Sequence, residues 1–236
     1  MLVLYTGTPG SGKSLDCAIN MYSWLRRGRH VLANFSINLD LVSKNCKNDI
    51  TFVKFENSKI TPEVFVNYSR EYRKKREAKG KRCKEGELKL IFDEAQVLFS
   101  SRRWQTLDPS WLTFFSQSRK YFYDIILICQ IDEMIDKQIR CLVEYEYKHR
   151  KLSNFGIFGK ILNLFYGGKT FCKITYWYPI KERLGSEMFH FNRKYADLYD
   201  TYEDFELGDH ILTVKEAKKL EQKKNKEAKE EKNKPE

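Results

Sequence analysis

Eight residues near the start of the chain have the composition and spacing of a phosphate-binding loop. They follow the pattern G-x-x-x-x-G-K-S and are Gly7, Thr8, Pro9, Gly10, Ser11, Gly12, Lys13 and Ser14. Glycines let such a loop wrap closely, so that backbone N–H groups point inward at phosphate oxygens. We expect Lys13 to reach the β- and γ-phosphates and the Ser14 hydroxyl to ligate Mg²⁺. The loop therefore predicts a site for ATP with Mg²⁺.

Two acidic residues further along the chain supply the second half of such a site. Asp93 and Glu94 directly follow the apolar run 88–92. A carboxylate at the end of an inner strand lies close to a phosphate loop, so we expect Asp93 to hold the hydration shell of Mg²⁺. Glu94 is then placed to polarise a water for attack on the γ-phosphate. Acids are also common at helix N-termini, but beside a phosphate loop the catalytic interpretation is favoured.

Gln130 ends the next apolar run, 125–129. Ligands of parallel sheets collect at the carboxyl ends of the strands, so Gln130 is expected to face the same crevice. Two interpretations stay open. Its side chain either senses the γ-phosphate and orients water, or is an ordinary polar residue at a strand end.

The elements that must position these residues alternate between strands and helices. Apolar runs predict strands at 2–5, 30–34, 50–55, 88–92 and 125–129, and alternating residue types predict two more at 142–148 and 171–178. Helical spacing and start signals predict helices at 13–27, 61–78, from about 94, at 108–120 and at 132–140. This order predicts an α/β fold, a three-layer P-loop NTPase with a mostly parallel central sheet.

Composition bounds the remaining possibilities. The 236 residues carry a formal net charge of +11, which suggests an anionic partner or only a soluble, lysine-rich chain. The six cysteines lack the spacing of a zinc site or a disulfide framework. The longest apolar-rich segment, 155–166, is interrupted by Gly159, Lys160 and Asn163 and is too short to span a bilayer. We expect an ATPase domain at residues 1–212 and a charged Lys/Glu-rich tail at 213–236.

A basic segment covers residues 70–84. It contains only two acids, Glu71 and Glu77, against nine cations: Arg70, Arg73, Lys74, Lys75, Arg76, Lys79, Lys81, Arg82 and Lys84. One interpretation is contact with a polyanion, either single-stranded DNA or anionic lipid, with Tyr68 and Tyr72 available for base stacking. The other is a solvated surface.

Taken together, these motifs resemble the Zot (zonular occludens toxin)-like family, the assembly and export ATPases of filamentous phages, which are related to the FtsK/HerA motors. The resemblance covers roughly residues 1–180. Beyond the phosphate loop it rests on Asp93-Glu94-Ala95-Gln96 with Phe99 and Arg102, and on a downstream series: Ser118-Arg119-Lys120, Asp124-Ile125, Gln130, Ile135-Asp136-Lys137, Ile139-Arg140, Val143-Glu144-Tyr145 and Arg150-Lys151.

The resemblance implies a homo-oligomeric motor that extrudes phage single-stranded DNA. Its implied partners are this DNA and the coat or assembly proteins of the phage. It also implies an arginine that acts in trans on a neighbour's nucleotide, and Arg119 and Arg140 stand at matching positions. Family members usually carry a membrane-spanning segment after the ATPase domain, whereas this sequence continues into the Lys/Glu tail. We therefore expect a protein of the host cytoplasm with peripheral contact to the inner membrane.

Two other classes of function remain. A P-loop kinase is disfavoured because a kinase must exclude water, and Glu94 directly after Asp93 serves hydrolysis. A non-catalytic interaction protein with a structural nucleotide is disfavoured by the complete set of Lys13, Ser14, Asp93 and Glu94.

Overall fold

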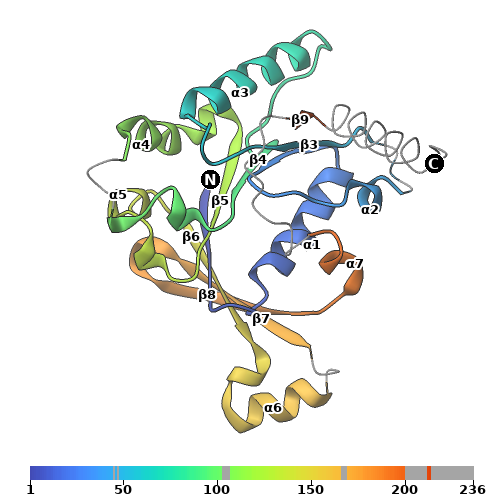
Figure 1. The fold of residues 1–236 in the computed structure, drawn as a ribbon, viewed down its shortest axis with the longest axis vertical. Helices are drawn as coiled ribbons and strands as arrows, with labels where there is room; N and C mark the ends of the chain where they lie inside the picture. Colours follow the sequence, from blue (N-terminus) through green and yellow to red (C-terminus); the bar gives the residue numbers. More distant parts are fainter. Residues whose placement is uncertain (45, 47, 103–106, 166–168, 200–211, 214–236) are drawn as a thin grey trace, which may run out of the picture.

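The strands of the chain form one sheet in the computed structural model, which describes residues 1–44, 46, 48–102, 107–165, 169–199 and 212–213 (Figure 1). The order across the sheet is β8-β7-β6-β1-β5-β4-β2-β3-β9. The strands are β1 (Leu2–Thr6), β2 (His30–Ala33), β3 (Thr51–Lys54), β4 (Leu88–Phe92), β5 (Tyr123–Ile128), β6 (Tyr145–Lys151), β7 (Thr170–Trp177), β8 (Glu182–His190) and β9 (Leu212–Thr213). The strands from β6 to β3 in this order run parallel, and β7, β8 and β9 add antiparallel edges.

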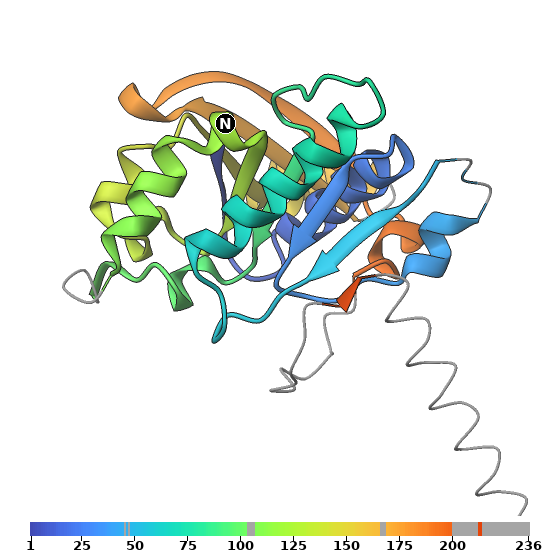
Figure 2. The ribbon, with the colours of Figure 1, turned by 90° about the horizontal axis from the view of Figure 1, so that it is seen from above.

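Helices cover both faces of this sheet, as Figures 1 and 2 show. One face holds α1 (Lys13–Arg26), α2 (Leu39–Ser43) and α7 (Arg193–Ala196), and the other holds α3 (Pro62–Glu77), α4 (Pro109–Ser116) and α5 (Lys137–Arg140). Each face has its own apolar core, because the central strands are buried on both sides. The α3/α4 face is rich in aromatic rings, with Phe65, Phe92 and Trp111 in edge or tilted contact. The predicted three-layer, mostly parallel fold is confirmed.

Several predicted boundaries differ from the structure. The helix expected from about residue 94 is only a 3₁₀ turn, η1 (Ala95–Val97). The helix expected at 132–140 is split into η4 (Asp132–Met134) and α5, because Ile135 bridges to Ser100 and the Asp136 N–H donates to the Phe99 carbonyl. The strand expected at 142–148 begins later, at Tyr145.

Several elements had no counterpart in the sequence predictions, and the two longest are β8 and α6. Strand β8 was missed because nearly all its residues are exposed, so that it lacks the alternating pattern of a half-buried strand. Helix α6 (Gly156–Phe165) lies outside the two helical layers, beyond the ends of β6 and β7 (Figure 1).

The remaining predictions concern cysteines, membrane and tail. All six cysteines are free, and Cys17 and Cys129 are buried in the core as expected. Within the described ranges, no helix combines the length and the apolar character that a bilayer crossing requires. The tail lies outside the described residues apart from Thr213, so the division at residue 212 stays a prediction.

Candidate nucleotide site

The phosphate-binding loop connects β1 to α1 and depends on glycine at both ends. Gly7 has φ of 140°, and a Cβ there would lie 2.4 Å from the His149 carbonyl oxygen. Gly12 has φ of 99°, and a Cβ there would lie 2.8 Å from the Phe171 ring. Both the left-handed backbone and the close neighbours exclude a side chain. The Gly7 N–H donates to the Gln130 carbonyl at 3.0 Å, which ties the loop to the end of β5.

Lys13, the first residue of α1, points its ammonium group back into this loop. Its Nζ donates to the carbonyl oxygens of Gly7 at 2.7 Å and Thr8 at 3.3 Å. Burial lowers the pKa of Lys13, and the negative charges of Glu94 and Asp93 act against that effect. The two carboxyl groups are therefore electrostatic neighbours of the lysine, as the sequence predicted.

The loop also leaves a buried polar atom without a partner. Ser11 is 1% exposed, and its Oγ has no hydrogen-bond partner in the described structure. Such an atom is costly to leave unpaired, and it lies within a loop whose residues 8–10 are exposed to solvent. A phosphate-binding loop accounts for this arrangement, because a bound anion supplies the acceptor that the protein lacks.

Asp93 is held in place by residues far away in the sequence. Its backbone exchanges two hydrogen bonds with the Asn34 side chain, at 2.7 and 2.9 Å. Its Oδ1 accepts from the Glu94 N–H at 2.9 Å, and the Tyr199 hydroxyl donates to Oδ2. Burial raises the pKa of Asp93, and the hydrogen bonds from Tyr199 and the Glu94 N–H act against this. Neither Asn34 nor Tyr199 was predicted, since no local pattern links them to Asp93.

Glu94 has a strained backbone. Its φ of 47° is left-handed, a conformation that costs a non-glycine residue roughly 1–2 kcal/mol. The Gln96 side-chain amide donates to the Glu94 carboxylate. Strain of this kind concentrates at functional sites. The left-handed conformation of Glu94 also turns the chain sharply at the end of β4. The short 3₁₀ turn replaces the predicted helix for the same reason.

A buried contact between His149 and Asp16 connects the helix that follows the loop to the sheet. His149 on β6 is fully buried, and its Nε2 lies 3.0 Å from Asp16 Oδ2 on α1. Lys173 on β7 lies 3.6 Å from the other Asp16 oxygen. The pair joins α1, β6 and β7 just where the His149 carbonyl meets Gly7. Sequence reasoning missed it, because it forms between residues distant along the chain.

The two predicted trans arginines lie elsewhere. Arg119 pairs with Glu85 at 3.1 Å and Glu144 at 2.9 Å. Both acids precede strands, so Arg119 lies at the amino edge of the sheet, opposite the phosphate loop. Arg140 Nε donates to the Ile135 carbonyl at 3.0 Å. Neither arginine contacts the loop of its own chain, and their roles stay predictions.

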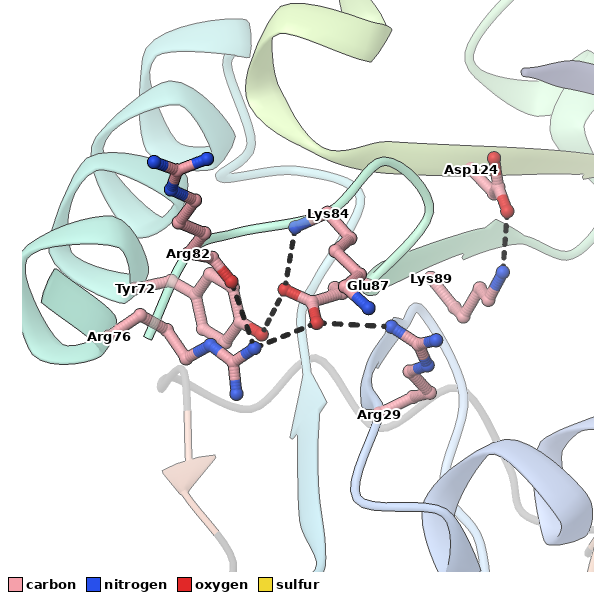
Figure 3. Close-up of polar contacts among 8 residues, drawn as sticks. All are labelled: Arg29, Tyr72, Arg76, Arg82, Lys84, Glu87, Lys89 and Asp124. Carbon is pink, nitrogen blue, oxygen red and sulfur yellow. Dashed lines mark hydrogen bonds and ion pairs between the residues drawn. The ribbon is translucent and has the colours of Figure 1, made fainter. Parts of the chain in front are cut away.

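Part of the basic segment makes contacts within the chain. Figure 3 shows these contacts around the buried Glu87. Arg76 Nη2 donates to Glu87 Oε1 at 3.0 Å, and the Tyr72 hydroxyl donates to Oε2 at 2.9 Å. Tyr72 is 8% exposed, and the Tyr68 hydroxyl lies 2.8 Å from His30 Nδ1. The expectation of base stacking is therefore wrong for the buried Tyr72, and for the half-buried Tyr68 it stays a prediction. The other cations of the segment are exposed.

The site residues fit Mg²⁺ and a nucleotide. Hydroxyl and carboxylate oxygens, as on Ser14 and Asp93, are ligands that Mg²⁺ prefers. Lys13, the loop amides and the unpaired Ser11 hydroxyl suit phosphates. The sheet order, the loop between β1 and α1 and the carboxylates after β4 define the P-loop NTPase fold.

Comparison with known proteins identifies the family. The family model for zonular occludens toxin (Zot) matches residues 1–183. The chain belongs to the Zot family. A search of curated proteins gives no match.

Solved structures agree on the fold. The N-terminal domain of zonular occludens toxin from Neisseria meningitidis is similar at 20% identity and a TM-score of 0.50, covering 85% of this chain and 98% of that chain. Another solved ATPase domain has 10% identity and a TM-score of 0.53, with 84% of each chain covered. The genome packaging NTPase B204 from Sulfolobus turreted icosahedral virus 2, in complex with ATP-gammaS, is 14% identical, and the match covers 80% of this chain and 96% of that chain. Its TM-score of 0.47 is too low to support a conclusion.

Proposed function

We propose that this protein is an ATP-hydrolysing motor for filamentous-phage assembly and export, which couples ATP turnover to extrusion of the phage's single-stranded DNA. Membership of the Zot family supports the biological setting. The observation that carries the chemistry is the grouping of Lys13, Asp93 and Glu94 at the carboxyl edge of the sheet, where each carboxyl group influences the pKa of the lysine.

Each residue of this edge then has a defined task. Lys13 binds the β- and γ-phosphates, while Ser14 and Asp93 hold Mg²⁺. Bound Mg²⁺ supplies charge neutralisation on the phosphate oxygens. Glu94 accepts a proton from the attacking water. Gln130, whose backbone is bonded to Gly7, orients that water.

Hydrolysis is favoured over phosphoryl transfer to a small molecule. The strained left-handed backbone of Glu94 fixes a carboxylate beside Asp93, and a base at that point activates water, which a kinase must exclude. Release of inorganic phosphate without an added acceptor distinguishes the two classes.

The partners follow from the family and from the charge. We propose a homo-oligomer in the host cytoplasm, with peripheral contact at the inner membrane and with coat or assembly proteins as partners. The exposed cations of residues 70–84, other than Arg76, are the proposed contact for phage single-stranded DNA. In the oligomer, Arg119 or Arg140 of one subunit acts on the neighbour's nucleotide.

The test is ATP turnover of the purified protein with and without single-stranded DNA, measured together with the oligomeric mass. We expect phosphate release that rises with DNA and requires the oligomer. Turnover by a monomer that ignores DNA would contradict the motor, and phosphate transfer only to an added acceptor would support the kinase.

A further inference from the structure

Helix α6 presents a row of large apolar side chains to solvent. The exposed fractions are Ile157 79%, Ile161 49%, Leu164 78% and Phe165 82%. Spacings of four, seven and eight residues place all of them on one face of the helix. Contiguous apolar surface of this kind marks an interaction site.

The opposite side of α6 is fixed to the domain, so the apolar row cannot turn inward. A Cβ on Gly159 would lie 2.4 Å from the Leu152 carbonyl oxygen, which means that the helix rests directly on the backbone of η5 (Leu152–Asn154). The Thr170 N–H donates to Asn163 Oδ1 at 3.1 Å and ties the helix to β7. The exposure of the row is therefore built into the fold.

The sequence on both sides of α6 is rich in cations. Residues 147–181 contain no Asp or Glu and seven cations: Lys148, Arg150, Lys151, Lys160, Lys169, Lys173 and Lys181. Lys173 and Lys181 pair with acids from other segments. The other five make no ion pair with any residue that the structure describes. Arg150 instead donates to the Asn154 carbonyl at 2.8 Å and lies over the Phe155 ring.

We propose that α6 docks on an anionic lipid bilayer, with its apolar row in the acyl region and the neighbouring cations at the headgroup phosphates. An apolar face flanked by lysine and arginine is the pattern of an interfacial helix. A second copy of the same face would set cation against cation. A nucleic acid has no acyl region to receive Ile157, Ile161 and Leu164. This surface extends the proposed function, because none of the four apolar side chains of α6 belongs to the nucleotide site.

The proposal fixes an orientation. Helix α6 and helix α3 lie at opposite ends of the longest axis of the molecule (Figure 1). Helix α6 follows β6, and the last residue of β6 lies next to the phosphate-binding loop: Lys151 Nζ is 3.3 Å from where a Cβ on Gly10 would be. The nucleotide edge therefore faces the bilayer, and the basic segment of α3 faces away from it.

The experiment is co-sedimentation of the full chain, without nucleotide, with phosphatidylcholine vesicles that contain or lack phosphatidylglycerol. We expect binding only to the anionic vesicles, and weaker binding at high salt. The double variant Ile157→Asn with Leu164→Asn should lower the partition coefficient by at least about tenfold, because two side chains no longer enter the acyl region. Lys160→Gln should lower it by a smaller factor.

Leu184→Asn is the matched control, since Leu184 is 54% exposed on β8, away from α6, and its loss should leave binding unchanged. Circular dichroism and ATP binding check that each variant is folded. Absence of vesicle binding, or equal binding by the double variant, overturns the proposal. A lower oligomeric mass of the double variant without vesicles also overturns it and makes the row a contact between copies. If the protein binds the anionic vesicles but does not turn over ATP, only the proposed motor is contradicted, and the proposed lipid contact of α6 stands.

Discussion

The two edges of the central sheet differ in how their polar groups are held. At the amino edge, charged groups are paired within the chain: Glu87 binds Arg76 and Arg29, and Asp124 binds Lys89. At the carboxyl edge, the buried Ser11 hydroxyl has no hydrogen-bond partner among the described residues, and Glu94 is held in a strained conformation. The amino edge therefore stabilises the fold, whereas the carboxyl edge keeps binding capacity free for a ligand.

The largest effect is expected from the arginine that acts on the nucleotide of a neighbouring subunit. Arg119 is held by two carboxylates of the amino edge, whereas the Arg140 side chain bonds the uncharged Ile135 carbonyl and Tyr178 hydroxyl. We expect Arg140→Ala to lower turnover by about 10³-fold, as the loss of an arginine finger does, and Arg119→Ala to change it little. Mixing Arg140→Ala with Lys13→Ala subunits should restore activity, because each supplies what the other lacks. If Arg119→Ala is the inactive variant, the amino edge is not merely structural.

Glu87 tests the stabilising role directly. Glu87→Gln leaves Arg76 and Arg29 without their shared carboxylate, and we expect the free energy of unfolding to fall by about 2–4 kcal/mol. ATP affinity of the folded variant should not change. Glu85→Gln is the control, because this exposed partner of Arg119 should cost less than about 1 kcal/mol. Urea denaturation gives both values, and a loss of ATP affinity at unchanged stability would reverse the assignment.

His30, beside Glu87 at the same edge, makes stability depend on pH. Burial, together with the charge of Lys75, lowers the pKa of His30 to about 4. The unfolded chain binds this proton at about pH 6.5 and the folded chain only at about pH 4. As the pH falls through this range, the free energy of unfolding therefore decreases by roughly 3 kcal/mol. His30→Gln should flatten that slope in urea denaturation. An unchanged slope in His30→Gln would assign the dependence to another group.

The basic segment gives the smallest expected effect. Arg76 must be spared because it binds Glu87, and Arg73 pairs with Glu77. Replacing Arg70, Lys74, Lys75 and Lys79 by Gln should flatten the salt dependence of single-stranded DNA binding by about 0.7 log units for each lost phosphate contact. ATP binding and vesicle binding should persist. An unchanged salt slope would make the segment only a solvated surface.

Local signals account for what the sequence predicted well. The loop at residues 7–14 and the strand at 88–92 were placed correctly because glycine spacing and an uninterrupted apolar run are features of adjacent residues. The carboxylates after β4 followed from the general geometry of parallel sheets.

Long-range contacts account for what the sequence could not predict. Tyr199 bonds Asp93 from beyond α7, and Ile135 bridges to Ser100 in the middle of a predicted helix. Strand β8 exists because β7 offers it a hydrogen-bonding edge, and its own residues are mostly exposed. None of these contacts leaves a periodic pattern in the sequence.

The central claim, that the carboxyl edge hydrolyses ATP, is tested most directly by phosphate release and ATP affinity of Glu94→Gln beside Lys13→Ala. We predict that Glu94→Gln binds ATP with Mg²⁺ as the unaltered protein does but turns it over about 10²–10⁴-fold more slowly, since a positioned base is lost. Lys13→Ala should lose binding, because the phosphates lose their cationic partner. Unaltered turnover in Glu94→Gln, or unaltered ATP affinity in Lys13→Ala, would contradict the account.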